Sequence, residues 1–298
     1  MGVEAVDGRI AGERGRLINI GYRLLGSLVE AEDAVQEAYA RWYALPGARR
    51  EEIASPGAWL TTVTGRICLD VLGSARVRRE RYVGAWLPEP LPGCVGDVAD
   101  AVVLDESVGM AFLVVLETMT PAERVAFVLH DVFRYPFAEI AEVLGRTAAA
   151  CKQLASSARR RVSAAEGASV AKGASVAVDG RAELVRRVKT AWEGGDVAAL
   201  VAVLDPAAVM TADGGGMVGA VLRPVEGGAR IAQYMVAIAD MAPGLELVER
   251  PVNGLPGLVA LRDGVVVTVA AFDVADGRVS RIWVVRNPAK LGPWAGEG

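Results

Sequence analysis

The residues best suited to a chemical task lie on one helix predicted near the middle of the chain. From Arg146 to Arg161 the sequence holds five basic residues and no acidic one. At helical spacing, the outer face of this segment is small and polar at its start and cationic at its end. That face comprises Ala149, Lys152, Gln153, Ser156, Arg159 and Arg160. Small side chains let a helix enter the major groove, Lys and Gln can hydrogen-bond base edges, and Arg can hold phosphates. The pattern favours DNA binding, although a generic amphipathic helical hairpin has the same periodicity.

The residues in front of this helix predict the turn that presents it. Phe137–Leu144 has the spacing of a short helix with an apolar inner side. Gly145 then supplies a turn, and Thr147 is positioned to cap the next helix. Two helices joined in this way predict a helix-turn-helix.

Acid–base catalysis has few candidate residues. His130 is the one histidine of the chain, and we expect a structural role for it. The carboxylates of the last third include Asp205, Asp213, Asp240 and Asp273. Asp205 precedes a proline and Asp213 precedes three glycines, which is typical of turns and of close backbone approach. We expect no catalytic residue, no metal and no cofactor.

Length and composition indicate a folded protein of about two domains. The chain has 298 residues, of which 52% are hydrophobic and 23% charged, with a net charge of −4. It has no apolar stretch long enough to span a bilayer and no apolar secretory segment at its start. The three cysteines are too far apart to suggest a metal motif or a disulfide framework. We therefore expect a cytoplasmic protein without a membrane partner.

Two segments divide the chain into three parts. Trp86–Gly96 contains three prolines, which exclude a continuous helix, and 166–180 repeats the sequence GASVA. The first two parts show helical patterns, with an apolar stripe from Ala31 to Trp42 and a capping box at Thr120 and Glu123. The third begins with two helical stretches and ends in three strand-like segments joined by Asp263-Gly264 and Asp276-Gly277, which predict tight hairpins. An α+β domain is expected there.

Several separated motifs resemble the extracytoplasmic-function sigma factors of bacterial RNA polymerase. They are AEDAVQEAYARW (31–42), PGAWLTTVTGRICLDVLGSARVRRERY (56–82) and ETMTPAERVAFVLHDVFRYPFAEIAEVLG (117–145). YVGAWLPEPL (82–91), DGGG (213–216) and NPAKL (287–291) resemble the subgroup with a fused SnoaL-like domain. The resemblance implies two all-α sigma domains followed by a cone-shaped α+β domain. The boundaries are sigma domain two at 1–82, a linker with WLPEPL at 83–106, sigma domain four at 107–165, a linker at 166–179 and the SnoaL-like domain at 180–298.

The resemblance also implies roles for the first two parts. The polar outer face of the 31–42 helix would bind core RNA polymerase at its clamp helices, while domain four would meet the flap. That face comprises Glu32, Asp33, Gln36, Glu37 and Arg41. The helix that starts near Pro56 would bind and open the minus-ten element. Its candidates are Trp59, Arg66, Arg76, Arg78 and Arg79. Trp59 also lies on an apolar stripe with Val63 and Ile67, which favours a core role.

The helix-turn-helix would read the minus-thirty-five element of promoter DNA. Thr147 joins the six residues of the outer face described above as a candidate there. The sequence departs from the family at Ser157-Ala158-Arg159, because Arg-Ala-Arg is common at this place. One expected cation is therefore missing.

The third part would regulate the other two, because the resemblance implies packing against the sigma domains. The candidate regulatory contacts are Asp213, Gly214, Gly215, Gly216, Asn287, Pro288 and Leu291. An unidentified small ligand in the cone is possible. Two alternatives to a sigma factor stay open: a helix-turn-helix regulator with a ligand-sensing domain, and a SnoaL-like cyclase or isomerase fused to a DNA-binding module.

Overall fold

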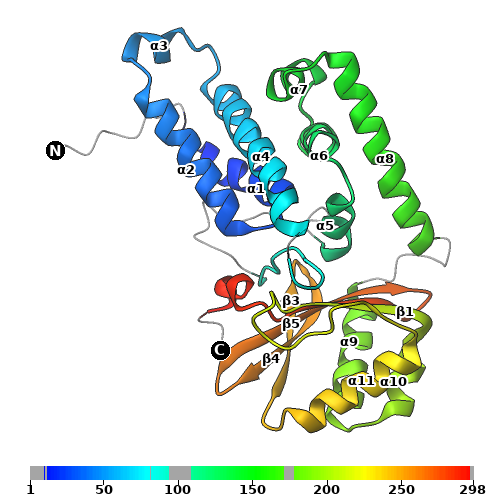
Figure 1. Ribbon diagram of the computed structural model, residues 1–298. Coiled ribbons are helices and arrows are strands. Elements are labelled where there is room, and N and C mark those ends of the chain that lie inside the picture. Colours follow the sequence, from blue (N-terminus) through cyan, green and yellow to red (C-terminus); the bar gives the residue numbers. More distant parts are fainter. Residues whose placement is uncertain (1–9, 11, 81, 94–108, 171–177, 296–298) are drawn as a thin grey trace. The chain divides into compact units, whose positions relative to one another are not determined.

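The computed structural model describes residues 10, 12–80, 82–93, 109–170 and 178–295 (Figure 1). The chain forms two compact units. The helical unit consists mainly of Met1–Arg78 and Val115–Val162. The α+β unit consists of Arg79–Cys94, Leu104–Val114 and Ser163–Gly298.

Four helices make up the first part of the helical unit: α1 (Glu13–Leu25), α2 (Leu28–Ala44), α3 (Gly47–Glu52) and α4 (Pro56–Glu80). α1 ends at Gly26, whose φ of 69° is left-handed, and Ser27 caps α2 by accepting the Glu30 N–H. The predicted stripe from Ala31 to Trp42 is confirmed, since its apolar residues are buried. A Cβ on Gly21 would lie 2.9 Å from the Ala31 Cβ, so α1 and α2 cross closely.

Four α-helices and one π-helical turn follow: α5 (Met110–Glu117), α6 (Pro121–Phe127), η2 (Val128–Val132), α7 (Phe137–Leu144) and α8 (Ala148–Val170). The predicted capping box is confirmed. The Thr120 hydroxyl accepts the Glu123 N–H, and the Glu123 carboxylate accepts the Thr120 N–H. η2 is a π-helical segment directly after α6, and it includes His130 and Asp131.

The α+β unit has a six-stranded mixed sheet in the order β2-β1-β6-β5-β4-β3. Its elements in chain order are α9 (Val178–Glu193), α10 (Val197–Val203), β1 (Leu204–Asp213), β2 (Val225–Glu226), α11 (Gly228–Met241), β3 (Glu246–Val252), β4 (Leu255–Arg262), β5 (Val265–Ala275) and β6 (Arg278–Val285). Two 3-10 turns close it, η3 (Pro288–Lys290) and η4 (Gly292–Trp294). The sheet is antiparallel except for β1 and β6, which run parallel.

The two hairpins predicted from sequence are confirmed, since β4, β5 and β6 pair antiparallel in chain order. Asp263 and Asp276 have φ values of 53° and 52°, and the glycine after each also has a positive φ. Asn and Asp tolerate this left-handed region and glycine adopts it freely, which is why Asp-Gly joins strands by a tight turn. Asn253-Gly254 forms a third such turn between β3 and β4.

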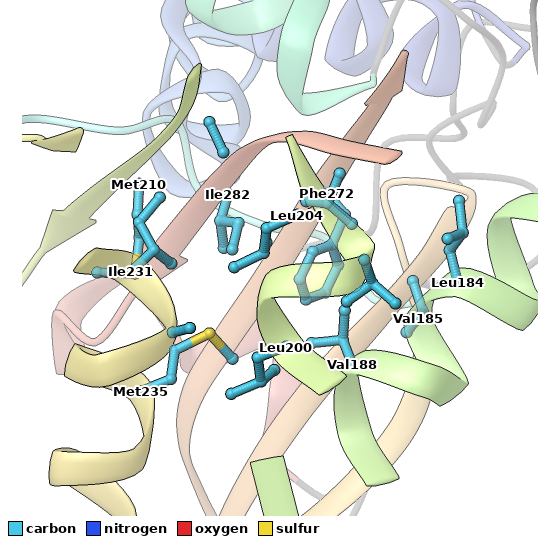
Figure 2. Close-up of a cluster of buried hydrophobic side chains, with 14 of the residues drawn as sticks. Leu184, Val185, Val188, Leu200, Leu204, Met210, Ile231, Met235, Phe272 and Ile282 are labelled. Atoms are coloured by element: carbon cyan, nitrogen blue, oxygen red, sulfur yellow. The ribbon is translucent and has the colours of Figure 1, made fainter. Parts of the chain in front are cut away.

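Both faces of the sheet are covered. α9, α10 and α11 lie against one face, and their apolar side chains point toward those of the strands (Figure 2). The opposite face carries a second apolar cluster, in which Val259, Val269 and Trp283 of the sheet meet Leu87, Leu291 and Trp294. Tyr82, expected to end sigma domain two, and residues 83–93, expected to be part of a linker, therefore belong to a layer of the α+β unit.

Parts of the second expected linker, 166–179, are helical in the described residues. α8 continues to Val170 and α9 begins at Val178, so helix covers both ends of the segment. A helix that is already nucleated extends at low cost, which lets α8 continue beyond the expected boundary. Residues 94–106 of the first expected linker lie outside the described residues.

Candidate functional site

The helix-turn-helix has the local geometry expected from its sequence. α7 ends at Gly145, whose φ of 61° is left-handed, and the Gly145 N–H donates to the Ala141 carbonyl. The Thr147 hydroxyl then accepts the Ala150 N–H at 3.2 Å and caps α8. Cys151, Ala155 and Ala158 are buried on the inner face of α8. The opposite face is thereby turned away from the domain.

Most of the predicted DNA-facing residues are exposed on that outer face. These are Thr147, Ala149, Lys152, Gln153 and Arg160. Ser156 is half-buried, and its hydroxyl donates to the Lys152 carbonyl at 2.8 Å. Arg159 differs from the rest, because its Nε and Nη2 donate to the two Asp131 oxygens at 2.6 and 3.2 Å. This bidentate pair fixes the Arg159 guanidinium against η2, so Arg160 is the more accessible cation of the two.

Ser157, where the resemblance led us to expect an arginine, contacts the capping box of α6. Its hydroxyl donates to Glu123 Oε1 at 2.7 Å, and Arg161 lies 3.7 Å from the same oxygen. Burial raises the pKa of Glu123, but hydrogen bonds from Thr120 and Ser157 and the charge of Arg161 outweigh it and lower that pKa overall. Residue 157 thus attaches α8 to the capping box of α6, where it serves packing within the domain.

The five candidate polymerase contacts form one exposed strip along α2. Glu32, Asp33, Gln36, Glu37 and Arg41 are all exposed. Arg41 donates to Glu37 one helical turn away. An exposed ion pair of this kind contributes little to stability, so the strip remains available to a charged partner.

The minus-ten candidates on α4 lie in different surroundings. Trp59 is half-buried and contacts Trp42 edge to face at 5.3 Å, which is a core position. Arg66 is exposed and donates to the Glu142 carbonyl through Nη2 at 2.8 Å. Arg76, Arg78 and Arg79 continue α4, and their side chains lie outside the described part of the chain.

Direct contacts join α1 and α4 to the helices after Val115 within the helical unit. Thr61 and Tyr135 share a buried hydrogen bond of 2.7 Å. A Cβ on Gly65 would lie 2.8 Å from a Val143 methyl, so α4 closely approaches α7 there. Arg124 of α6 donates to the Leu24 carbonyl of α1 at 2.8 Å and pairs with Glu117 at 2.7 Å.

The candidate regulatory residue Asp213 lies in a polar network with no solvent exposure. Its Oδ1 accepts the Tyr82 hydroxyl at 2.6 Å and the Gly215 N–H at 3.0 Å. Its Oδ2 accepts the Leu87 N–H at 2.9 Å and the Lys290 ammonium at 2.7 Å. Four donors around one carboxylate satisfy its charge in a site without water contact.

Asn287 and Lys290 complete this network from the C-terminal side. The Asn287 amide donates to the Tyr82 hydroxyl at 2.8 Å, while its oxygen caps η3 through the Ala289 N–H. The Lys290 ammonium also donates to the Leu87 carbonyl and lies 3.9 Å from the Trp86 ring centroid. Burial, and then the hydrogen bond to Asp213, raises the pKa of Tyr82, so this phenol stays protonated and donates.

Backbone contacts extend the attachment of residues 82–93 along the same sheet face. Leu91 and Asn253 are joined twice, because the Leu91 N–H donates to Asn253 Oδ1 at 3.1 Å and the Asn253 N–H donates to the Leu91 carbonyl at 2.8 Å. The Trp294 indole donates to the Pro90 carbonyl at 2.8 Å. We call residues 82–93 with Asp213, Asn253, Asn287, Lys290 and Trp294 the clasp.

The three glycines after Asp213 allow the close approach expected from sequence. Gly215 and Gly216 have φ values of 65° and 70°. A Cβ on Gly215 would lie 2.6 Å from the Asn287 amide, and one on Gly214 would lie 2.5 Å from the Val218 carbonyl. Pro288 and Leu291, also predicted as regulatory contacts, line a cavity of the same unit.

Sequence reasoning missed several clasp residues. Tyr82, Asn253, Lys290 and Trp294 were not among the candidates. The Asn-Gly pair at 253–254 is a hairpin signal that would have placed Asn253 at a strand end. Lys290 lies inside the NPAKL motif, but its burial against Asp213 depends on contacts far apart in sequence.

The described part of the chain holds neither a cluster of metal ligands nor a membrane-spanning helix. No group of three His, Cys, Asp or Glu side chains there is arranged to bind a metal ion. No helix in the same residues is both long and apolar enough to cross a membrane.

The helix-turn-helix and the preceding four-helix domain match known sequence families. Residues 10–81 match Sigma-70 region 2, and residues 109–162 match Sigma-70, region 4. These two regions in this order define a promoter-recognition subunit of RNA polymerase, a class to which a lone helix-turn-helix regulator does not belong.

Proteins that are similar over nearly the whole chain indicate which kind of sigma factor this is. The ECF RNA polymerase sigma factor SigJ of Mycobacterium tuberculosis (strain ATCC 25618 / H37Rv) is 40% identical over 291 residues, which cover 93% of this chain and 90% of SigJ. The probable ECF RNA polymerase sigma factor SigI of the same strain is 34% identical over 287 residues, covering 95% and 94%. The crystal structure of M. tuberculosis SigJ superposes with a TM-score of 0.74 at 35% identity, covering 94% of this chain and 96% of that one.

The chain belongs to the extracytoplasmic-function RNA polymerase sigma factors. As a sigma factor it binds core RNA polymerase and promoter DNA and directs transcription initiation. The expected fold, two helical sigma regions followed by an α+β domain, is confirmed.

Proposed function

We propose that the α+β domain modulates transcription initiation by this sigma factor through the clasp. The observation that carries the proposal is the attachment of residues 82–93, which directly follow the region 2 match, to Asp213 and Lys290. A segment that leads from one promoter-reading region toward the other is thereby bound to the α+β domain. Because two elements of one promoter must be read together, constraint on this segment bears on initiation.

The positions of the acidic residues support a regulatory role over a catalytic one. Asp205 accepts the Ala207 N–H in a turn, and Asp213 is enclosed by its four donors. Asp273 lies 3.7 Å from Arg181 and accepts the Val274 N–H. These three carboxylates are engaged in structure, whereas a general acid or base has to reach a substrate.

Transcription tests the proposal. We expect deletion of residues 287–298 to change open-complex formation and transcript yield by roughly fivefold or more, the lower end of typical couplings between sites. The assay uses core polymerase, the full chain or the variant, and a promoter found by mapping transcript starts with the reconstituted enzyme. Lys290→Met is the minimal version of the same change, and Lys189→Met, at the surface pair with Glu193, is its control.

Circular dichroism and polymerase co-migration must show that the helical unit of each variant is folded and binds the enzyme. With that established, unchanged transcription by both the deletion and Lys290→Met removes the proposal.

We propose that the strip on α2 binds the polymerase clamp helices. Region 4 is proposed to bind the flap. Region 4 is proposed to read the minus-thirty-five element with the exposed residues of α8, and α4 to open the minus-ten element. Because of its ion pair with Asp131, Arg159 contributes less to this reading than Arg160.

Base recognition by α8 gives a direct prediction. Lys152 is exposed near the start of α8, and contact with a base edge contributes about 1–3 kcal/mol of discrimination. We expect Lys152→Ala to weaken holoenzyme binding to the preferred minus-thirty-five sequence while binding to a scrambled element changes little. Arg160→Ala should instead weaken both and reduce the dependence of binding on salt. An equal loss on both sequences for Lys152→Ala would assign Lys152 to phosphate.

A further inference from the structure

The α+β unit contains a cavity of about 540 Å³, lined by residues of the sheet, of α9 and α11, and of the C-terminal turns. This size lies in the range of small-molecule sites. Its lining includes Met210, Met235, Phe272 and Ile282, which Figure 2 shows among the apolar side chains between the strands and the helices. Trp192 and Tyr234 add aromatic rings to the lining.

The charges around the cavity all have one sign. Of the residues that line it, Arg262 and Arg286 are the charged ones, and no Asp, Glu or His is among them. Arg286 donates to the Gly219 carbonyl. The side chain of Arg262, exposed at the end of β4, forms no ion pair or hydrogen bond with the residues that the structure describes. An apolar chamber with a cationic rim suits a ligand with an apolar body and one negative group.

The wall of the cavity and the clasp share one chain segment. Pro288, Leu291 and Trp294 line the cavity, whereas Asn287 and Lys290 on the same turns bind Tyr82 and Asp213. Trp294 belongs to both, since its indole donates to the Pro90 carbonyl. Any shift of η3 and η4 that accommodates a ligand therefore moves clasp donors.

We propose that this cavity binds one apolar organic anion, with the anionic group at Arg262, and that occupancy alters the strength of the clasp. The effect of the ligand on the clasp rests on the proposed function. The binding of the anion rests on the cavity alone. Coupling between two sites is reciprocal. Opening the clasp must therefore change the affinity of the cavity for its ligand by the same factor by which bound ligand changes the equilibrium between open and closed clasp.

Two dyes with the same ring system test the cavity in the full chain. 8-Anilino-1-naphthalenesulfonate carries a sulfonate, whereas N-phenyl-1-naphthylamine has the same rings without charge, and both fluoresce in apolar sites. We expect each dye to saturate a single site. Arg262→Gln should weaken binding of the sulfonate roughly tenfold, since it removes a hydrogen bond to a charged group, and should leave the neutral dye unchanged.

A second experiment fills the cavity with a larger side chain. Thr268 is a half-buried residue of β5 that lines the cavity, and Thr268→Trp should abolish binding of both dyes. The control is Thr190→Trp on the exposed side of α9, which should leave the binding of both dyes unchanged. If circular dichroism shows Thr268→Trp to be unfolded, Val284→Phe replaces it. Dye binding that survives the filled cavity, or equal loss of both dyes in Arg262→Gln, overturns the anion site.

The link to the clasp has its own readout. Lys290→Met should change the affinity for the sulfonate dye by at least roughly fivefold, as coupled sites do. Unchanged affinity in this variant would refute the coupling while leaving the site. Conversely, a normal dye site together with unaltered transcription in the clasp variants would refute the proposed function alone.

Discussion

Lys290→Met should lower the free energy of unfolding of the α+β unit by about 3–5 kcal/mol, the cost of removing one partner from a buried ion pair. The Lys290 side chain is 11% exposed and Asp213 is fully buried, so the remaining carboxylate has no route to water. Methionine keeps the length and apolar stem of lysine, which confines the change to the ammonium group. Hydrogen exchange of β1 and β6, measured by mass spectrometry, reports the loss.

The control for this effect is Lys189→Met. Lys189 pairs with Glu193 one helical turn away, at 24% and 44% exposure, so its loss should cost about 0.5 kcal/mol or less. Equal losses in the two variants would show that the Asp213 network tolerates an uncompensated charge, contrary to the geometry described above.

Arg124→Met is expected to destabilise the helical unit by about 3–5 kcal/mol for a related reason. Arg124 is 3% exposed and holds both the Glu117 carboxylate and the Leu24 carbonyl in the last turn of α1. A helix end buried without partners for its carbonyls is costly. Burial lowers the pKa of Arg124 to about 10, but the side chain remains charged near neutrality and keeps both contacts.

Urea unfolding followed by the helical circular dichroism signal measures the effect of Arg124→Met. Arg49→Met in α3 is the matched control, since Arg49 and Glu52 are 70% and 61% exposed. A loss in Arg124→Met no larger than in this control would mean that water replaces Arg124 at Leu24.

The helical unit was largely predictable because its signals are local. Gly145 and Thr147 lie within four residues of the groups that they cap, and Thr120 and Glu123 satisfy each other. The Asp-Gly turns are equally local, which is why three strands were predicted at the end of the chain. In each case the residue type restricts its own backbone or its nearest neighbours.

The clasp was not predictable in the same way. Three prolines in 86–96 exclude a helix but do not indicate what an extended segment will contact. Asp213 meets Tyr82 from 131 residues away and Lys290 from 77. The parallel pairing of β1 with β6 is also remote in sequence, although it places Asp213 beside Val285 and so near Asn287. Glycines at 214–216 indicated a close approach but not its partner.

The fixed position of residues 82–93 on the sheet has a consequence for the reach of the two promoter-reading regions. Sixteen residue steps separate Gly93 from Gly109, and at full extension they cover roughly 55 Å. Counted from Tyr82, where the clasp begins, the separation is 27 steps, for which the upper limit is roughly 90 Å. Under the proposed function, a closed clasp would therefore limit the separation between two DNA elements that one molecule can span.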